Sequence, residues 1–226
     1  MASLGFTSFV DIFASPQLVF ERIRAKSLSF WAPLSVLLIV LTAFMVWYFM
    51  TIDIRAYMET TFVLSGQEVA PEQLEAVMAN LQMVRIVSPI TAPLVSLFIY
   101  VLLATFFFLA ATLVAEEKFS FGQFFTLVCW ASLPALLSTL SMAVSYAVSP
   151  DFVFISLLDK TNLASLLGMA VGDANFSTYA SLSIGAIWSY LLYAFGFAYI
   201  TGSSAATATM VGLIPPAVQF ALTYFL

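Results

Sequence analysis

Hydroxyl side chains gather in two apolar stretches of the chain, and they are the groups best suited to chemistry in this sequence. The members of this set are Ser132, Ser138, Thr139, Ser141, Ser145, Tyr146, Ser183, Ser189 and Tyr190. In apolar helices that lie side by side, such hydroxyls can line a polar seam that admits water or a lipid headgroup. They can also form interhelical hydrogen bonds worth about 0.6 kcal/mol each. Of these two interpretations, we favour interhelical hydrogen bonds and keep the polar seam as the alternative.

Acid–base and metal chemistry lack their usual residues. The chain has no histidine, which excludes a Ser-His-Asp triad, a Cys-His pair, a histidine zinc motif and a haem held by histidine. Its one cysteine, Cys129, excludes an intrachain disulfide, and we expect it to be a small buried apolar side chain. Asp151 and Asp173 fall in polar connections, outside the long apolar stretches. We therefore expect no enzyme, no metal site and no cofactor.

The composition indicates a membrane protein. The 226 residues are 62% hydrophobic and 8% charged, whereas a soluble domain carries about 25% charged residues. The mean hydropathy is +1.04. The net charge of −5 argues against nucleic acid as a partner, because nucleic acid requires a basic face. The length predicts a single membrane domain over residues 1–226.

Five long apolar runs define the elements that must position these side chains. They cover about residues 32–52, 94–115, 124–149, 180–200 and 205–226. Each run is close to the roughly 20 residues that a helix needs to cross a bilayer. The predicted fold is an all-α, polytopic transmembrane bundle of five spans, with an N-terminal interfacial helix and a small extracytoplasmic helical cap.

The third run contains Pro134 inside its apolar helix. A proline there bends the helix and frees a backbone carbonyl, which neighbouring helices or hydroxyls must satisfy in hydrocarbon. We therefore expect this helix to be central. The candidate gate or seam residues are Trp130, Pro134, Ser138, Ser141, Tyr146 and Ser189.

Residues 1–30 form a cytoplasmic amphipathic segment. Ser15 and Pro16 read as a helix N-cap followed by proline at the first helical position. Val19 and Ile23 lie four residues apart on one face, with charged residues on the other. Such a helix lies in the headgroup region, and it also serves as a positive flank of the first span. The candidate headgroup contacts are Arg22, Arg24, Lys26 and Trp31.

Two longer connections, 53–87 and 150–179, are predicted to be extracytoplasmic loops with short helices. In the first, Pro71 is a good helix start, and an apolar stripe follows it; the stripe is Leu74, Val77, Met78 and Leu81. This helix would form the cap over the bundle.

The stretch 150–172 is apolar, but Asp159, Lys160 and Asn162 divide it into pieces too short to cross a membrane. Thr161 or Asn162 can cap a second short helix there. We interpret the stretch as a surface-lying or re-entrant hairpin, with a sixth span as the alternative.

The basic residues suggest an orientation. With the N-terminus inside, the inner segments 1–30, 116–123 and 201–204 hold Arg22, Arg24, Lys26 and Lys118, and the outer loops hold Arg55, Arg85 and Lys160. Short cytoplasmic loops are enriched in lysine and arginine. The sequence therefore predicts the N-terminus inside and the C-terminus outside.

Small residues recur at four-residue spacing in the last two spans. They are Ser181, Gly185 and Ser189 on the fourth span, and Ala208 with Gly212 on the fifth. This spacing allows helices to approach closely. It serves packing within the chain or a homo-oligomer, and the short turn at 201–204 favours packing within the chain.

The sequence resembles the Yip1 domain family of five-span membrane proteins. The residues that carry the resemblance are Phe13–Pro16, Val19–Ile23, Trp31–Leu34, Phe119–Phe124, Trp130 and Pro134. The resemblance implies the five-span fold over nearly the whole chain. Eukaryotic members are linked to vesicle traffic between endoplasmic reticulum and Golgi, and to Rab-type small GTPases.

Two departures weigh against a small GTPase as partner. The N-terminal part before the first span is short, and Cys129-Trp130-Ala131 replaces the Gly-Tyr-Gly run of those members. Both features make the chain similar to short prokaryotic members in a bacterial cytoplasmic membrane. We therefore expect a non-enzymatic membrane protein that binds lipids, other membrane proteins or a second copy of itself. The alternative is a small transporter, channel or lipid-translocating protein that uses the serine-rich seam.

Overall fold

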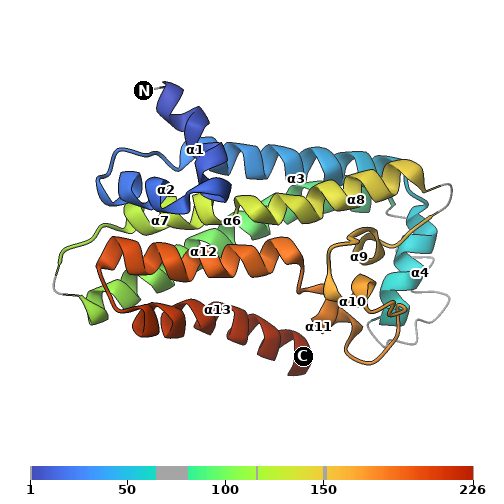
Figure 1. Cartoon of the computed structure of the whole chain (residues 1–226). Helices are drawn as coiled ribbons and strands as arrows, with labels where there is room; N and C mark the ends of the chain where they lie inside the picture. The colour runs from blue at the N-terminus through green and yellow to red at the C-terminus, as the bar shows by residue number, and fades with distance from the viewer. Residues whose placement is uncertain (1, 65–80, 116, 150–151, 226) are drawn as a thin grey trace.

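The computed structural model describes residues 2–64, 81–115, 117–149 and 152–225 as a helical bundle (Figure 1). In chain order its helices are α1 Ala2–Ala14, α2 Pro16–Arg24, α3 Trp31–Thr51, α4 Ile54–Leu64, α6 Leu81–Val114, α7 Phe121–Ala131, the 3₁₀ helix η1 Leu133–Ala135, α8 Leu136–Val148, α9 Ile155–Leu158, α10 Leu163–Leu166, α11 Phe176–Ala180, α12 Ile184–Thr201 and α13 Ala205–Phe225. Within these residues, five helices are long and apolar enough to cross a membrane: α3, α6, α7 to α8 as one unit, α12 and α13. The predicted all-α bundle of five spans is confirmed.

The third span changes geometry at Pro134, as the sequence predicts. Helix α7 ends at Ala131, η1 includes Pro134, and α8 continues the span. Every residue of α7 from Gln123 to Ala131 is buried, because α2, α3, α6 and α12 all pack against this helix. The first half of the span is therefore the centre of the bundle. Helix α8 is more exposed, and Thr139 is its one buried residue.

Helix α6 begins at Leu81, well before residue 94, where the apolar run of the second predicted span starts. Pro89 and Pro93 lie inside this 34-residue helix. A helix inside a membrane bundle tolerates such prolines when its neighbours satisfy the freed backbone groups. The additional turns bring Arg85 to the end of α3, where Nη1 donates to the carbonyl of Phe49 at 2.7 Å.

The predicted helix start at Pro71 and the cap helix that it would begin lie outside the described residues. In the described part of that connection, α4 follows α3 directly. Asp53 stabilises its first turn by accepting from the backbone N–H of Arg55 at 2.9 Å and of Ala56 at 3.2 Å.

The N-terminal helices pack on the bundle instead of lying apart from it. Ser15 is the N-cap of α2 and Pro16 its first residue, as predicted, although the Ser15 side chain makes no capping hydrogen bond. The apolar face of α2, formed by Val19, Phe20 and Ile23, is buried. This face packs against α7 and α12, which run beside α2 in Figure 1. The apolar side of α2 therefore contacts protein.

Helices α12 and α13 form a tight antiparallel pair. Gly202 ends α12 in a left-handed conformation with φ of 69°, which glycine adopts without strain. Gly212 of α13 lies against Ala194 of α12 so closely that a Cβ on Gly212 would overlap the Ala194 side chain. Ala208, one turn earlier, is buried. The small residues of α13 thus contact the same chain.

Helix α12 begins at Ile184, so the prediction that Ser181 lies on the fourth span is wrong. Ser183 is the N-cap of α12, and its Oγ accepts from the backbone N–H of Ala186 at 3.1 Å. This cap starts the helix later than the apolar pattern suggests. Ser181 instead follows the short helix α11 as its C-cap.

The described part of the 150–172 stretch, from residue 152 on, is a hairpin of two four-residue helices, α9 and α10, and not a sixth span. Asn162 caps α10, as predicted: its Oδ1 accepts from the backbone N–H of Ser165 at 2.8 Å. The hairpin folds back along α8, because the backbone N–H of Lys160 donates to Ser141 Oγ at 2.9 Å. Its tip therefore lies beside α8, not beyond the end of that helix.

Candidate functional site

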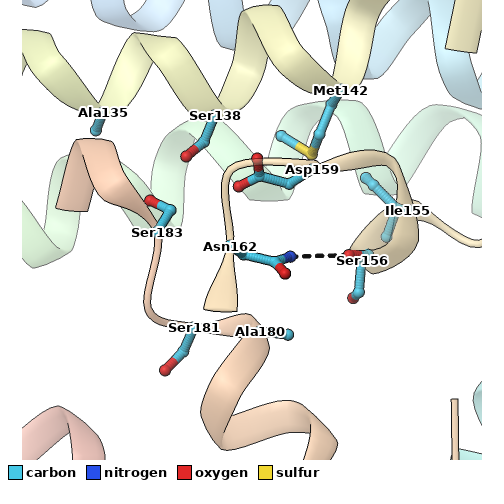
Figure 2. A pocket seen from close by; sticks show the side chains of 10 residues that line it. All are labelled: Ala135, Ser138, Met142, Ile155, Ser156, Asp159, Asn162, Ala180, Ser181 and Ser183. Carbon is cyan, nitrogen blue, oxygen red and sulfur yellow. Dashed lines mark hydrogen bonds between the residues drawn. The ribbon is translucent and has the colours of Figure 1, made fainter. Parts of the chain in front are cut away.

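A pocket of about 350 Å³ lies between α8, the hairpin and the connection from α11 to α12 (Figure 2). Its lining residues are Ala135, Ser138, Met142, Ile155, Ser156, Asp159, Asn162, Ala180, Ser181 and Ser183. The walls combine hydroxyl groups, one carboxylate, one amide and apolar side chains. Irregular backbone borders the pocket, which is the arrangement that membrane proteins use where non-helical segments line a cavity.

Asp159 is the charged group of this pocket. Its side chain is buried, with 7% of the residue exposed. Two hydrogen bonds reach the same carboxylate oxygen, Oδ1: one from the backbone N–H of Thr161 at 2.9 Å and one from its hydroxyl at 2.6 Å. Figure 2 shows the carboxylate pointing toward the side of the pocket on which Ser138 and Ser183 lie.

The neighbouring cation does not neutralise Asp159. The ammonium group of Lys160 donates instead to the carbonyl of Leu157 at 2.7 Å. Among the described residues, the ion pairs join Arg22 to Asp11, Arg24 to Glu117 and Arg55 to Glu59. The Asp159 carboxylate is thus held by hydrogen bonds alone within this part of the chain.

Asn162 fixes the shape of the pocket. Its Nδ2 donates to the carbonyl of Ser156 at 3.0 Å, while its Oδ1 caps α10. The residues next to it pair with the start of α12: the backbone N–H of Ile184 donates to the carbonyl of Thr161 at 3.1 Å. Asn162 is 1% exposed, and both the nitrogen and the oxygen of its amide are hydrogen-bonded within the chain, so we assign it a structural role.

Some of the residues predicted for the seam meet at this pocket. Ser138 lines it, and Ser141 borders it through its hydrogen bond with Lys160. Ser181, which was predicted for helix packing, also lines it. Gly185 lies next to Pro134: a Cβ on Gly185 would overlap the Pro134 carbonyl oxygen.

Ser189, one turn beyond Gly185 on α12, is 3% exposed. Its hydroxyl has no hydrogen-bond partner among the residues that the structure describes. It does not line the pocket.

Two other seam candidates lie elsewhere. Trp130 is buried among the N-terminal elements, where its Nε1 donates to the carbonyl of Ser29 at 3.0 Å. The hydroxyl of Tyr146 lies 2.6 Å from Thr51 Oγ1, at the end of α3. Neither side chain lines the pocket.

The predicted headgroup residues gather at the N-terminal end of the bundle. Arg22 donates to Asp11 at 2.6 Å and to Ser8 at 2.7 Å, so its charge is largely compensated. Arg24 approaches Glu117 at 3.5 Å, with both side chains exposed. Lys26 is exposed, and Trp31 is 66% exposed. The helix-packing residues Ala208 and Gly212 belong to the contact between α12 and α13 described above.

Asp159 and Asn162 are not among the site residues predicted from the sequence. There they mark the polar break in an apolar stretch, and Asn162 is also a predicted helix cap. Their signal was present, because a carboxylate and an amide between two apolar segments that cannot each span a bilayer must be satisfied inside protein or at water. Across the described ranges, no three His, Cys, Asp or Glu side chains gather as a metal site would require.

The five apolar helices, one of which is a central span with a buried first half, define a polytopic helical membrane protein. The family model of the Yip1 domain matches residues 10–226, nearly the whole chain. The chain therefore belongs to the Yip1 domain family, and the resemblance found in the sequence is confirmed. No curated protein and no solved structure matches it.

Proposed function

We propose that this Yip1 domain protein acts without catalysis, by binding lipids and protein partners within the membrane. The observation that carries the proposal is the use of the seam hydroxyls in contacts inside the chain. Ser132 Oγ lies 2.6 Å from the Tyr193 hydroxyl and donates to the Val128 carbonyl at 2.7 Å. Such hydrogen bonds hold helices together, and hydroxyls engaged in this way are poor candidates for the lining of a conduction path.

The same pattern continues along the third span. Ser141 accepts from the hairpin backbone at 2.9 Å, and Ser138 lies 3.4 Å from the Thr161 hydroxyl. The span begins in α7, which is buried from Gln123 to Ala131. A transporter that used Pro134 as a gate would have to break these contacts in each cycle, so the geometry favours a packed bundle.

The outer surface of the bundle supports binding to lipid. Helix α6 exposes a row of large apolar side chains: Leu94, Phe98, Leu102, Leu109 and Leu113. Exposed apolar faces of this length are suited to acyl chains or to the apolar helices of other membrane proteins, including a second copy of this chain.

We further propose a bacterial cytoplasmic membrane as the location, with the N-terminus inside. Arg24 and Glu117 lie within 3.5 Å of each other, so the basic N-terminal segment and the Lys118 connection share one end of the bundle. A cluster of basic residues at one end is typical of the cytoplasmic side.

Flux measurements test the binding function. The purified protein is placed in liposomes, and the movement of fluorescent solutes and of labelled lipids across the bilayer is compared with that of protein-free liposomes. We expect equal rates. Movement that depends on the protein and is lost in Pro134→Ala, but retained in the control Pro215→Ala on α13, would overturn the proposal in favour of a transporter, channel or lipid-translocating protein.

A further inference from the structure

We propose that the pocket beside Asp159 binds a primary ammonium group. The group belongs to the headgroup of an aminophospholipid or to a small free amine. This inference rests on the proposed binding function and names the ligand class of one site within it.

The first argument is charge. Buried charges in proteins are paired or coordinate a metal. Asp159 is 7% exposed, and no Lys or Arg side chain of the described residues forms an ion pair with it. Both of its side-chain hydrogen bonds end on Oδ1. A cationic donor in the pocket would supply the missing countercharge and would bond to Oδ2.

The second argument is the set of acceptors. An ammonium group has three hydrogens to donate and accepts none. Ser138 and Ser183 line the same pocket, and Figure 2 shows their hydroxyl oxygens on the side toward which the Asp159 carboxylate points. Ser183 Oγ accepts one hydrogen bond, from the backbone N–H of Ala186 at 3.1 Å, so its second lone pair remains available. The carboxylate and these two hydroxyls together match the three donors.

The third argument is size and wall chemistry. A bare divalent cation prefers six or more oxygen ligands, usually with several carboxylates, and this pocket offers one carboxylate. Its volume of about 350 Å³ is far larger than an ion requires. Ala135, Met142 and Ile155 add apolar wall, which suits the methylene groups next to an amine.

The experiment measures lipid retention in the full chain. The protein is placed in nanodiscs of phosphatidylglycerol mixed with either phosphatidylethanolamine or phosphatidylcholine, and retained lipid is identified by native mass spectrometry. Phosphatidylcholine is the matched probe because its trimethylammonium group cannot donate hydrogen bonds. Free ethanolamine, added to protein in phosphatidylglycerol discs, tests the soluble source through the shift in melting temperature.

The variant pair is Asp159→Asn and Asp53→Asn. Asp53 is a matched control because it is exposed and also accepts both of its hydrogen bonds on Oδ1. We expect Asp159→Asn to weaken amine binding about tenfold, as for one charge-assisted hydrogen bond. Asp53→Asn should bind as the wild type does.

Each outcome of these measurements either supports or overturns the ammonium site. Selective retention of phosphatidylethanolamine with no response to ethanolamine supports a headgroup, and a response to ethanolamine supports a free amine. Equal retention of both lipids together with no response to ethanolamine overturns the inference, even if Asp159→Asn fails to fold. Equal binding by the wild type and a folded Asp159→Asn also overturns it. These results are independent of the flux measurements, so the two proposals can fail separately.

Discussion

Trp130 shows how one side chain organises the N-terminal end of this protein. Its indole N–H donates to the carbonyl of Ser29, 101 residues away in the sequence. Its ring lies 4.9 Å from that of Phe9 in α1. The residue therefore joins α7 both to the first helix and to the chain that enters α3. Its position points to anchoring, where the sequence had suggested a gate.

Replacing this residue tests the anchoring role. Trp130→Phe removes the hydrogen bond and leaves a smaller ring in a site that is 0% exposed. We expect a loss of about 1–3 kcal/mol of stability from the missing bond and the imperfect fit. The measurement is the melting temperature in detergent. The control, Trp31→Phe, changes a side chain that is 66% exposed and should melt as the wild type does. An unchanged melting temperature in Trp130→Phe would argue against the anchoring role of Trp130.

At the same scale, the burial of side chains could be predicted from the sequence better than the lining of the pocket. Cys129 is fully buried, as expected of a small apolar side chain. The burial of Asp159 was harder to predict, because it depends on a hairpin that folds back onto α8 through contacts such as that of Lys160 with Ser141. A fold-back of this kind is a tertiary event, and no local periodicity encodes it.

At the scale of elements, α12 and η1 meet at a contact between backbones. Gly185 of α12 lies against the carbonyl oxygen of Pro134, with no room for a Cβ. The proline changes the path of the third span, and the glycine lets the fourth span follow it closely. The pairing also sets the position of Ser183, the N-cap of α12, at the pocket.

Gly185→Ala is therefore expected to destabilise the protein. The added methyl group would overlap backbone, which cannot move aside as a flexible side chain can. Overpacking of this kind costs about 1–3 kcal/mol. The melting temperature of Gly185→Ala is compared with that of Gly122→Ala, where a Cβ meets no atom within 4 Å. Equal melting temperatures of the two variants would show that Gly185 and the Pro134 carbonyl are far enough apart to admit a methyl group.

Some helix boundaries could be predicted from the sequence and others could not. Helix α3 matched the prediction because a long apolar run with aromatic ends has a clear start and end. Helix α6 begins earlier than the predicted run, because its first turns carry polar residues such as Gln82 and Arg85 and so fall outside the apolar pattern. The start of α12 was also misplaced, because the capping hydrogen bond of Ser183, and not the apolar pattern, decides the first residue of that helix.

At the scale of the whole molecule, connections from distant parts of the chain share each end of the bundle. At one end, Tyr199 near the close of α12 donates to Glu21 of α2 at 2.9 Å. At the other end, Thr178 of α11 donates to the carbonyl of Thr223 near the close of α13 at 2.9 Å. Figure 1 shows α1 and α2 at the first end and the end of α13 at the second. The N- and C-terminal helices thus reach opposite ends.

Cysteine labelling in intact cells tests the orientation. Lys118→Cys and Lys160→Cys place thiols at exposed sites on the two ends. We expect a membrane-impermeant maleimide to label Lys160→Cys in intact cells, and Lys118→Cys only after permeabilisation. The native Cys129 should stay unlabelled because it is buried, so it serves as the internal control. The reverse pattern would place the N-terminus outside.

The length of α6 has a consequence for the lipid around the protein. Its 34 residues measure about 51 Å, whereas a bilayer hydrocarbon core is about 30 Å thick. The usual tilt of about 20° shortens its projection only to about 48 Å. Part of the helix therefore stands outside the hydrocarbon, and apolar side chains near Arg85, such as Met83 and Ile86, meet the headgroup layer. Helix α12, with 18 residues, fits a bilayer of ordinary thickness, so the mismatch is not shared by every span, and the lipids next to α6 must adapt to its length.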